Sequence, residues 1–328
     1  MAQDNRINLV LDQLQISSSA KVLILNSQDP QLLQSHGHVE HQQFFKPMHQ
    51  RLDAAGVTLV DAPNGPYDFV IVSTTKSKLE SLGLIGLGYT QLNVGGTLII
   101  NGDKTNGIEG RFKDLRKISP VSPAISKAHG KVFWVEKSEG NSAIGDWIDH
   151  LSLLENDAGF AVTHGCFSPA QVDQGSAMLA ETLPQLTGMV ADFGAGWGYL
   201  AVTALANNPD ISTLHLYEAY APALSCAQHN ISDARAQLHW TDVTALTGEA
   251  FDTILMNPPF HQGKRTDISL GQAFIKSSAR NLAKHGQLYL VANRQLAYET
   301  TLNACFGQVE TLTQAQGFKL IKATKPKA

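Results

Sequence analysis

The stretch Asp192–Gly198, which reads DFGAGWG, decides how the second half of the chain folds. It follows a short apolar run at 189–191 and precedes an apolar helical run at 199–205, so the sequence predicts a strand, a glycine turn and a helix. The glycines allow a tight turn and a close approach to a ligand, beside the unpaired N–H groups of a helix N-terminus. Many nucleotide-binding sites share such a turn, so the turn alone does not specify the ligand.

Further polar residues follow at the expected ends of strands. Glu218 ends an apolar run at 214–217, and Asp242 lies just past a third run at 237–240. A fourth run at 251–256 leads into the sequence NPPF at 257–260. These signals, in this order, predict an S-adenosylmethionine site at the carboxyl edge of a sheet. The loop beside it is expected to hold an amine for methylation.

Each acidic residue has a specific expected partner on the cofactor. Asp192 can hold the ammonium group, Glu218 can accept both ribose hydroxyls, and Asp242 can accept from the adenine amine. The simpler interpretations are a cap or solvent role for Asp192, an exposed side chain for Glu218 and a helix N-cap for Asp242. The predicted cofactor-binding residues are Asp192, Gly194, Gly196, Gly198, Glu218, Asp242 and Asn257.

The NPPF loop supplies the predicted catalytic residues Asn257, Pro258 and Phe260. An exocyclic amine on a purine is a poor nucleophile, because its lone pair is drawn into the ring. The Asn257 side-chain oxygen and the Pro258 carbonyl can accept the amine hydrogens and turn the lone pair toward the methyl group. Phe260 can stack on the base. A plain proline turn is the alternative interpretation.

Three residues are predicted to contact the substrate: Phe167, Lys264 and Arg265. The two basic residues lie shortly after Phe260, where they can meet a phosphate backbone. Phe167 precedes a predicted helix with Asp173, Gly175 and Ser176 on its first turns. This segment either covers the methionine end of the cofactor or is simply a capped helix.

The first half of the chain has the same succession of predicted strands and helices as the second. Residues 68–76 align without gaps on 252–260, and 92–98 align on 282–288, but the NPPF loop and the glycine turn are both missing. We predict an α/β protein of two tandem Rossmann-like methyltransferase domains with doubly wound sheets, a degenerate copy at 1–145 and a catalytic copy at 146–328 that closes with an antiparallel hairpin. The alternative to duplication is the general likeness of doubly wound domains.

Bulk properties restrict the partners. A length of 328 residues suits two domains, and a net charge of −4 leaves RNA contacts to local patches such as the basic residues at 111–117, which can equally be a solvated helix face. The cysteines lack metal spacing, and His36, His38 and His41 are expected to be solvent-facing loop residues, so no metal is predicted. No signal peptide or membrane span is apparent, and we expect a cytoplasmic monomer.

The chain resembles the bacterial ribosomal RNA small-subunit methyltransferase C family and the related large-subunit methyltransferase G. The motifs that carry the resemblance are Phe167-Ser168 with Asp173, Gly175 and Ser176, DFGAGWG at 192–198, NPPFH at 257–261, GHVEHQQF at 37–44 and GDKTNGI at 102–108. The resemblance implies a guanine-N2 methyltransferase whose degenerate first domain serves RNA recognition and support. Glu218 stands where many relatives carry aspartate, which is chemically harmless.

The combined prediction is methyl transfer from S-adenosylmethionine to the N2 amine of a guanine in ribosomal RNA, in the small subunit, with ribosomal RNA or a ribosomal subunit as the partner. The same chemistry could act on a large-subunit guanine, on adenine N6 or on a protein glutamine. An inactive scaffold that still binds the cofactor is the alternative of another class.

Overall fold

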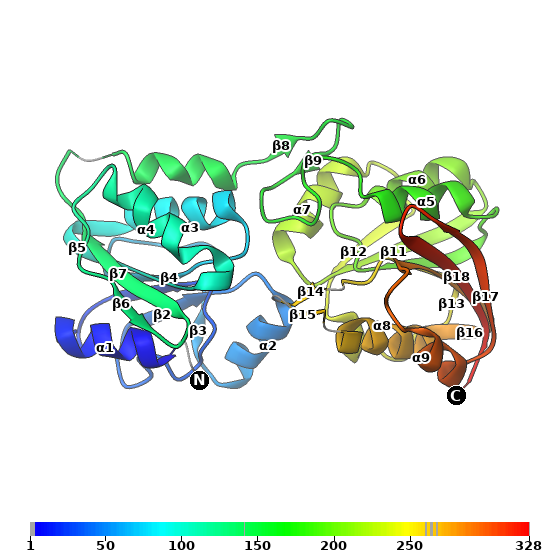
Figure 1. The fold of residues 1–328 in the computed structure, drawn as a ribbon, viewed down its shortest axis with the longest axis horizontal. Helices are drawn as coiled ribbons and strands as arrows, with labels where there is room; N and C mark the ends of the chain where they lie inside the picture. Colours follow the sequence, from blue (N-terminus) through cyan, green and yellow to red (C-terminus); the bar gives the residue numbers. More distant parts are fainter. Residues whose placement is uncertain (1–3, 141, 260, 263–264, 267, 328) are drawn as a thin grey trace. The chain divides into compact units, whose positions relative to one another are not determined.

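The computed structural model describes residues 4–140, 142–259, 261–262, 265–266 and 268–327. The chain divides into two compact units, one of residues 1–152 with 163–165 and one of 153–162 with 166–328 (Figure 1). The 3-10 helix η2 (Gly145–Leu151) belongs to the first unit, where it packs on helix α3 (Lys78–Thr90). The predicted domain boundary between 145 and 146 therefore falls within an element of the first unit.

The first unit is a mostly parallel sheet with helices on both faces. Its sheet order is β3-β2-β1-β4-β5-β7-β6; the strands from β3 to β5 run parallel, and β7 and β6 are antiparallel. Besides α3 and η2 its elements are α1 (Asp4–Leu14), β1 (Val22–Leu25), β2 (Val39–Gln42), α2 (Lys46–Ala54), β3 (Thr58–Leu59), β4 (Tyr67–Ser73), β5 (Leu92–Asp103), η1 (Lys104–Asn106), α4 (Ile108–Arg116), β6 (Ile125–Lys127) and β7 (Gly130–Glu136).

The second unit has the same strand order, β12-β11-β10-β13-β16-β18-β17. The predicted tandem of doubly wound sheets is confirmed, and so is the antiparallel hairpin of β17 and β18 at the end of the second sheet. Its elements are β8 (Leu154–Glu155), β9 (Ala161–Val162), α5 (Gln174–Thr182), β10 (Gly188–Phe193), α6 (Tyr199–Asn207), β11 (Ile211–Glu218), α7 (Ala221–Asn230), β12 (Ala236–Trp240), η3 (Val243–Ala245), β13 (Phe251–Met256), β14 (His261–Gln262), β15 (Arg265–Thr266), α8 (Ile268–Asn281), β16 (Leu282–Asn293), α9 (Glu299–Cys305), β17 (Phe306–Ala315) and β18 (Phe318–Pro326).

The likeness of the two units extends to individual contacts. Strands β5 and β16 have the same length of 12 residues and the same sequence of buried and exposed positions. The Asp68 carboxylate accepts from the Lys21 N–H at 2.9 Å, and the aligned Asp252 accepts from the Met189 N–H at 2.8 Å. A shared side-chain contact of this kind favours duplication over a general likeness between doubly wound sheets.

The prediction that His41 lies in a solvent-facing loop is wrong. His41 lies in β2, between β1 and β3, and is buried. Its Nδ1 atom is 2.8 Å from the Ser27 hydroxyl, and burial lowers its pKa to about 4. The sequence VEHQ concealed this strand, because its buried residues His41 and Gln42 are polar and are accommodated by hydrogen bonds to Ser27 and Asp61.

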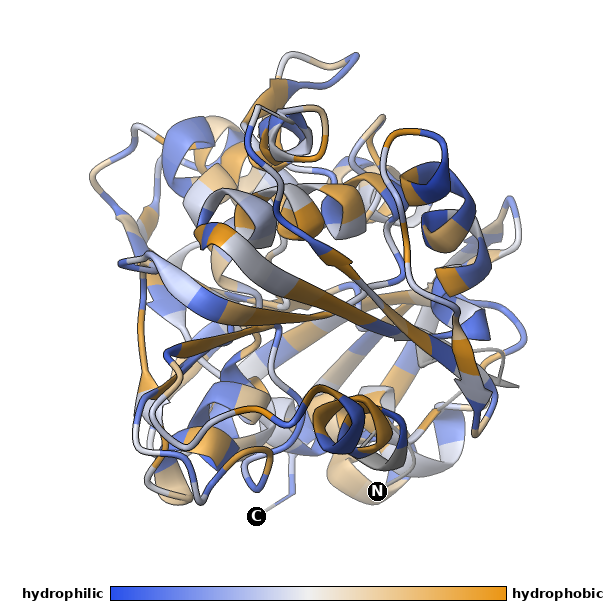
Figure 2. Ribbon diagram, turned by 90° about the vertical axis from the view of Figure 1, so that its left-hand side faces the viewer, coloured by the Kyte–Doolittle hydropathy of each residue, from blue (hydrophilic) through white to orange (hydrophobic). Residues whose placement is uncertain are grey.

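Each sheet is buried on both faces, as the near-continuous apolar strands require. In the second unit, α5, α6 and α7 pack on one face, and α8 and α9 pack on the other (Figure 1). Figure 2 shows hydrophobic residues along the central strands and hydrophilic residues on the outer turns of the helices. Among the described residues, no helix has both the length and the apolar character needed to cross a membrane, and no cluster of three metal-ligating side chains occurs.

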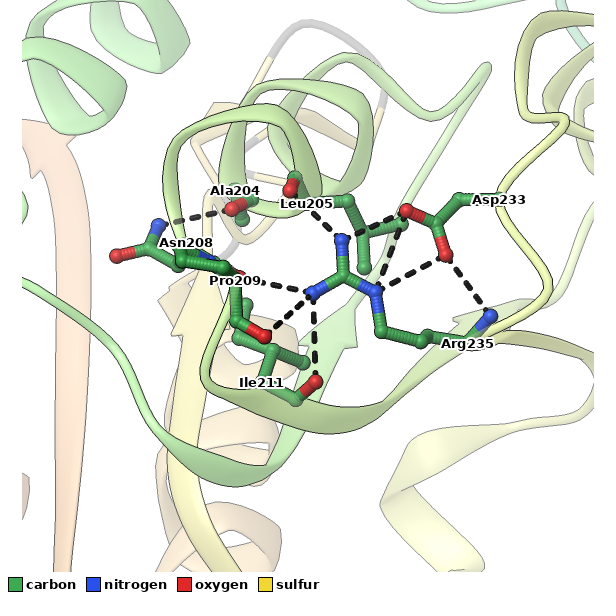
Figure 3. Close-up of polar contacts among 7 residues, drawn as sticks. All are labelled: Ala204, Leu205, Asn208, Pro209, Ile211, Asp233 and Arg235. Atoms are coloured by element: carbon green, nitrogen blue, oxygen red, sulfur yellow. Dashed lines mark hydrogen bonds and ion pairs between the residues drawn. The ribbon is translucent and has the colours of Figure 1, made fainter.

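The helix that follows the glycine turn is fastened at its far end by Arg235. The last carbonyls of a helix have no partner within it. The Arg235 guanidinium donates to the carbonyls of Leu205 at 2.8 Å and Asn208 at 2.9 Å, and Asp233 holds it at 2.7 Å (Figure 3). The C-terminal end of α6 is thereby fixed to the segment before β12.

Candidate active site

The glycine turn at the end of β10 is built as its sequence predicts. Gly194, Gly196 and Gly198 have positive φ angles of 77°, 56° and 91°, a region that favours glycine. The N–H groups of Gly194 and Ala195 donate to the Tyr217 carbonyl at 2.9 and 3.1 Å, which ties the turn to β11. A Cβ atom added at Gly196 would meet nothing within 4 Å, so the space beside this residue is open.

Asp192 lies at the carboxyl end of β10 and is 1% exposed. Neither carboxylate oxygen has a hydrogen-bond partner among the described residues. Burial, reinforced by the Glu218 carboxylate and opposed by the Ala201 N–H, which lies nearby without reaching hydrogen-bond geometry, raises the pKa of Asp192 to about 7. A buried carboxyl group without a partner costs free energy, and a cation beside it would remove that cost.

Glu218 ends β11 and bridges the glycine turn to the next helix. Its Oε2 atom accepts from the Gly196 N–H at 2.8 Å, and its Oε1 atom accepts from the Tyr220 N–H at 2.7 Å. Burial raises the pKa of Glu218, and these N–H groups oppose the rise. A carboxylate offers about four acceptor positions, so each oxygen can still accept one hydroxyl.

Asp242 follows β12 and forms the N-cap of η3. Its Oδ1 atom accepts from the backbone N–H of Thr244 at 2.9 Å and from the Thr244 hydroxyl at 2.7 Å. The helix-capping role, the simpler interpretation of Asp242, is therefore present. The same carboxylate retains Oδ2 for a ligand.

Asn257 follows β13, and its side chain is held by the start of α5. The Nδ2 atom donates to Asp173 Oδ2 at 2.9 Å and to Ser176 Oγ at 2.8 Å. Both amide hydrogens are thus used within the protein, which leaves the side-chain carbonyl oxygen for another group. In the same loop Pro258 is buried and Pro259 is exposed.

Of the predicted substrate residues, the structure describes Phe167 in full. Its side chain is 56% exposed, and its carbonyl oxygen accepts from Trp197 Nε1 at 3.0 Å. An exposed aromatic ring is thereby tied to the glycine turn. Phe260 and Lys264 lie outside the described residues, and of Arg265 only the backbone position in β15 is described.

The contact of Asp173 and Ser176 with Asn257 is not evident in the sequence. The sequence places both residues at the start of a helix, as a cover for the cofactor or as part of a capped helix. Asp173 does cap α5, through Ser176, and the same oxygen also binds Asn257. No periodicity could have revealed this contact, because the partners are 84 and 81 residues apart.

Comparison with known proteins gives a consistent result. The model of the family "Methyltransferase small domain" matches residues 157–322. The ribosomal RNA small subunit methyltransferase C of Shewanella amazonensis is 32% identical over 77% of this chain and 76% of its own length. The protein of that name from Acinetobacter baylyi is 28% identical over 98% of this chain and 99% of its own length.

One solved structure is similar over nearly the whole chain. It is the T. thermophilus 16S rRNA N2 methyltransferase in complex with AdoMet and guanosine, with a TM-score of 0.79 and 26% identity. The likeness covers 96% of this chain and 91% of the solved chain, so it includes both units.

Proposed function

The chain belongs to the ribosomal RNA small subunit methyltransferase C family, and on that premise we propose that it methylates the exocyclic N2 amine of a guanine in 16S ribosomal RNA with S-adenosylmethionine. The observation that carries the proposal is the likeness over 96% of the chain to a 16S rRNA N2 methyltransferase in complex with AdoMet and guanosine. The polar residues of the second unit supply the groups that this reaction needs.

The residues at the ends of β10, β11 and β12 fit the cofactor. The unpartnered Asp192 carboxylate suits the ammonium group, and the open space beside Gly196 admits a ligand against the backbone. Glu218 keeps an acceptor position on each oxygen for the two ribose hydroxyls, and Asp242 keeps Oδ2 for the adenine amine. Gly194 and Gly198 complete the proposed cofactor site by giving the turn its shape.

The proposed catalytic residues orient the amine. When bound, S-adenosylmethionine supplies an electrophilic methyl group on a sulfonium. The Asn257 carbonyl oxygen and the Pro258 carbonyl accept the two amine hydrogens, which turns the nitrogen lone pair toward that methyl group. No strong base is required for this step, because orientation supplies most of the rate gain. Phe260 is proposed to stack on the base, and its geometry lies outside the described residues.

The RNA contacts are proposed on chemical grounds. The exposed Phe167 ring offers a stacking surface next to the glycine turn, and Lys264 and Arg265 offer cations to phosphates. The degenerate first domain, predicted from the sequence to span residues 1–145, is proposed to support RNA recognition. We also propose that the enzyme is a cytoplasmic monomer, which light scattering on the purified protein and fractionation of cells would test.

Single-turnover methylation of 16S ribosomal RNA tests the site. Asn257→Ala is expected to slow methyl transfer by about two to three orders of magnitude, by analogy with the loss of one preorganised group in an active site. Cofactor affinity should change little, because the amide acts mainly in the transition state. Asn303→Ala, on the exposed side of α9, is the matched control. A near-wild-type rate for Asn257→Ala would make the loop a structural turn.

Modified-nucleoside mapping tests the substrate. Ribosomal RNA from cells that lack this protein should lose one N2-methylguanine in the small subunit and recover it on complementation. Loss of a large-subunit guanine, of N6-methyladenine or of a methylated protein glutamine would instead support the corresponding alternative. Unchanged RNA and protein, with intact cofactor binding, would support an inactive scaffold.

A further inference from the structure

We propose that Asp173 and Ser176 are positioning residues that set the orientation of the Asn257 amide, an inference that rests on the methyl-transfer function proposed above. Neither residue needs to touch the base. Their effect reaches the reaction only through the side chain that they hold. We refer to Asp173 and Ser176 together as the amide clamp.

The clamp leaves the Asn257 amide one favourable orientation. Its Nδ2 atom is 2.9 Å from Asp173 Oδ2 and 2.8 Å from Ser176 Oγ. An ionised carboxylate only accepts hydrogen bonds, so a reversed amide would set its carbonyl oxygen against a carboxylate oxygen. With both N–H groups used, the carbonyl oxygen is the part of the Asn257 side chain that can meet an amine.

The clamp itself is held by the start of α5. Asp173 Oδ2 also accepts from the Ser176 N–H at 2.9 Å, so one oxygen caps the helix and binds Asn257. A Cβ atom at Gly175 would lie 2.9 Å from the Phe318 ring and 3.0 Å from Asp173 Oδ2. The absence of that atom lets the helix start pack closely on β18, which fixes the clamp against the sheet.

This arrangement prepares the acceptor before the substrate arrives. A free asparagine side chain can rotate about two bonds, and a flip of its amide interchanges the positions of the oxygen and the nitrogen. If the amide had to be fixed during the reaction, methyl transfer would be slower. The clamp makes that selection in the folded protein. It also explains why Ser176, which is 9% exposed, carries a hydroxyl directed at a loop that lies 81 residues further along the chain.

A double-mutant cycle in the full-length protein tests the proposal. Ser176→Ala removes one acceptor of the Asn257 amide and keeps the backbone N–H that Asp173 caps. We expect the single-turnover rate on 16S ribosomal RNA to fall about threefold to tenfold, the range for one lost hydrogen bond, with unchanged cofactor affinity. In the Asn257→Ala background the same change should have no further effect. Thr182→Ala removes a hydroxyl bonded within the same helix and is the matched control.

An equal loss of rate in the wild-type and Asn257→Ala backgrounds would overturn the proposal, because Ser176 would then act elsewhere. A second readout needs no RNA. In protein labelled with ¹⁵N-asparagine, the side-chain NH₂ signals that vanish in Asn257→Ala identify this amide. They should shift and exchange faster with solvent in Ser176→Ala but not in Thr182→Ala.

Unchanged NH₂ signals in Ser176→Ala would also overturn the clamp. The two readouts separate this inference from the proposed function. If wild-type protein leaves 16S ribosomal RNA unmethylated while the NH₂ signals respond as expected, the substrate is wrong and the clamp stands.

Discussion

Asp192 is buried without a hydrogen-bond partner among the described residues, so its charge depends on what binds beside it. Its pKa is raised to about 7, whereas the complex with an ammonium group requires the ionised form. Cofactor binding should therefore release a proton below this pH. We expect affinity to be about fivefold to tenfold weaker at ~pH 6 than at about pH 7.5.

Calorimetric titration in two buffers of different ionisation enthalpy measures this proton release. Asp192→Asn should bind the cofactor weakly and with little dependence on pH. Between pH 3.8 and about 7 the folded protein holds a proton that the unfolded chain releases, so this group's contribution to stability falls as the pH rises through that window. Asp192→Asn should accordingly raise the Tm of the cofactor-free protein above pH 7. A wild-type affinity that is constant across these pH values would contradict the assignment.

Glu218 serves the fold and the proposed ligand with the same two oxygens. Glu218→Ala removes the acceptor for two hydroxyls, and hydrogen bonds to a charged group contribute ~1.5–3 kcal/mol. Cofactor affinity should drop roughly tenfold to a hundredfold. The Gly196 and Tyr220 N–H groups also lose their acceptor, so a lower Tm should accompany the loss. Glu310→Ala, at an exposed position of β17, is the control, and equal cofactor dissociation constants for both variants would remove Glu218 from the site.

At the scale of elements, substitutions at two glycines of the turn should distinguish an effect on stability from an effect on cofactor binding. A Cβ atom at Gly198 would lie 3.1 Å from Ala227 Cβ and 3.2 Å from Ile231 Cδ1, whereas one at Gly196 would meet nothing within 4 Å. Both substitutions pay for a left-handed backbone, roughly 1–2 kcal/mol. Gly198→Ala should therefore lower the Tm further than Gly196→Ala. Gly196→Ala should mainly weaken cofactor binding, because its methyl group enters the open space, and a Gly196→Ala variant with wild-type affinity would argue against that location of the ligand.

The elements around this turn could be predicted from sequence to within a few residues. Apolar runs bounded by glycine or polar residues indicated β10, β11, β12 and β13, because buried parallel strands need apolar side chains on both faces. Strand β2 could not be predicted, since three of its four side chains are polar and the buried ones, His41 and Gln42, are accommodated by hydrogen bonds to residues distant in sequence. The contact of α5 with Asn257 depends on how two distant segments meet, which local patterns do not encode.

At the scale of the whole molecule, strand register shows what the first unit lacks. Val22 pairs with Phe69 in the first unit, and Val190 pairs with Thr253 in the second. Because Phe69 aligns with Thr253, Val22 corresponds to Val190. Ile24, two residues further on, therefore occupies the place of Asp192. Val22 also pairs with Val39, and Val190 pairs with Leu214, so Val39 corresponds to Leu214. Gln43, four residues after Val39, therefore occupies the place of Glu218.

The substituted residues change the chemistry of that site. Ile24 is buried and has no charge to offer an ammonium group. The Gln43 amide donates to the Ser27 carbonyl at 2.6 Å, so it is used within the protein. Ser73 replaces Asn257, and its carbonyl accepts from the Asn26 side chain at 2.9 Å. Side-chain amides of the first unit thus bond to its own backbone carbonyls, where the second unit keeps open space and spare acceptors.

This difference predicts that each chain binds one molecule of S-adenosylmethionine. Calorimetry on the full-length protein should give a stoichiometry of about one, and Glu218→Ala should weaken that single site roughly tenfold to a hundredfold. Each unit has its own hydrophobic clusters, so the fragments 1–152 and 153–328 can be compared directly. The second fragment should bind S-adenosylmethionine with an affinity close to that of the whole chain, and the first should not bind it. Binding by the first fragment would mean that Ile24 and Gln43 do not disable the site, and it would overturn the assignment of the first unit as a degenerate copy.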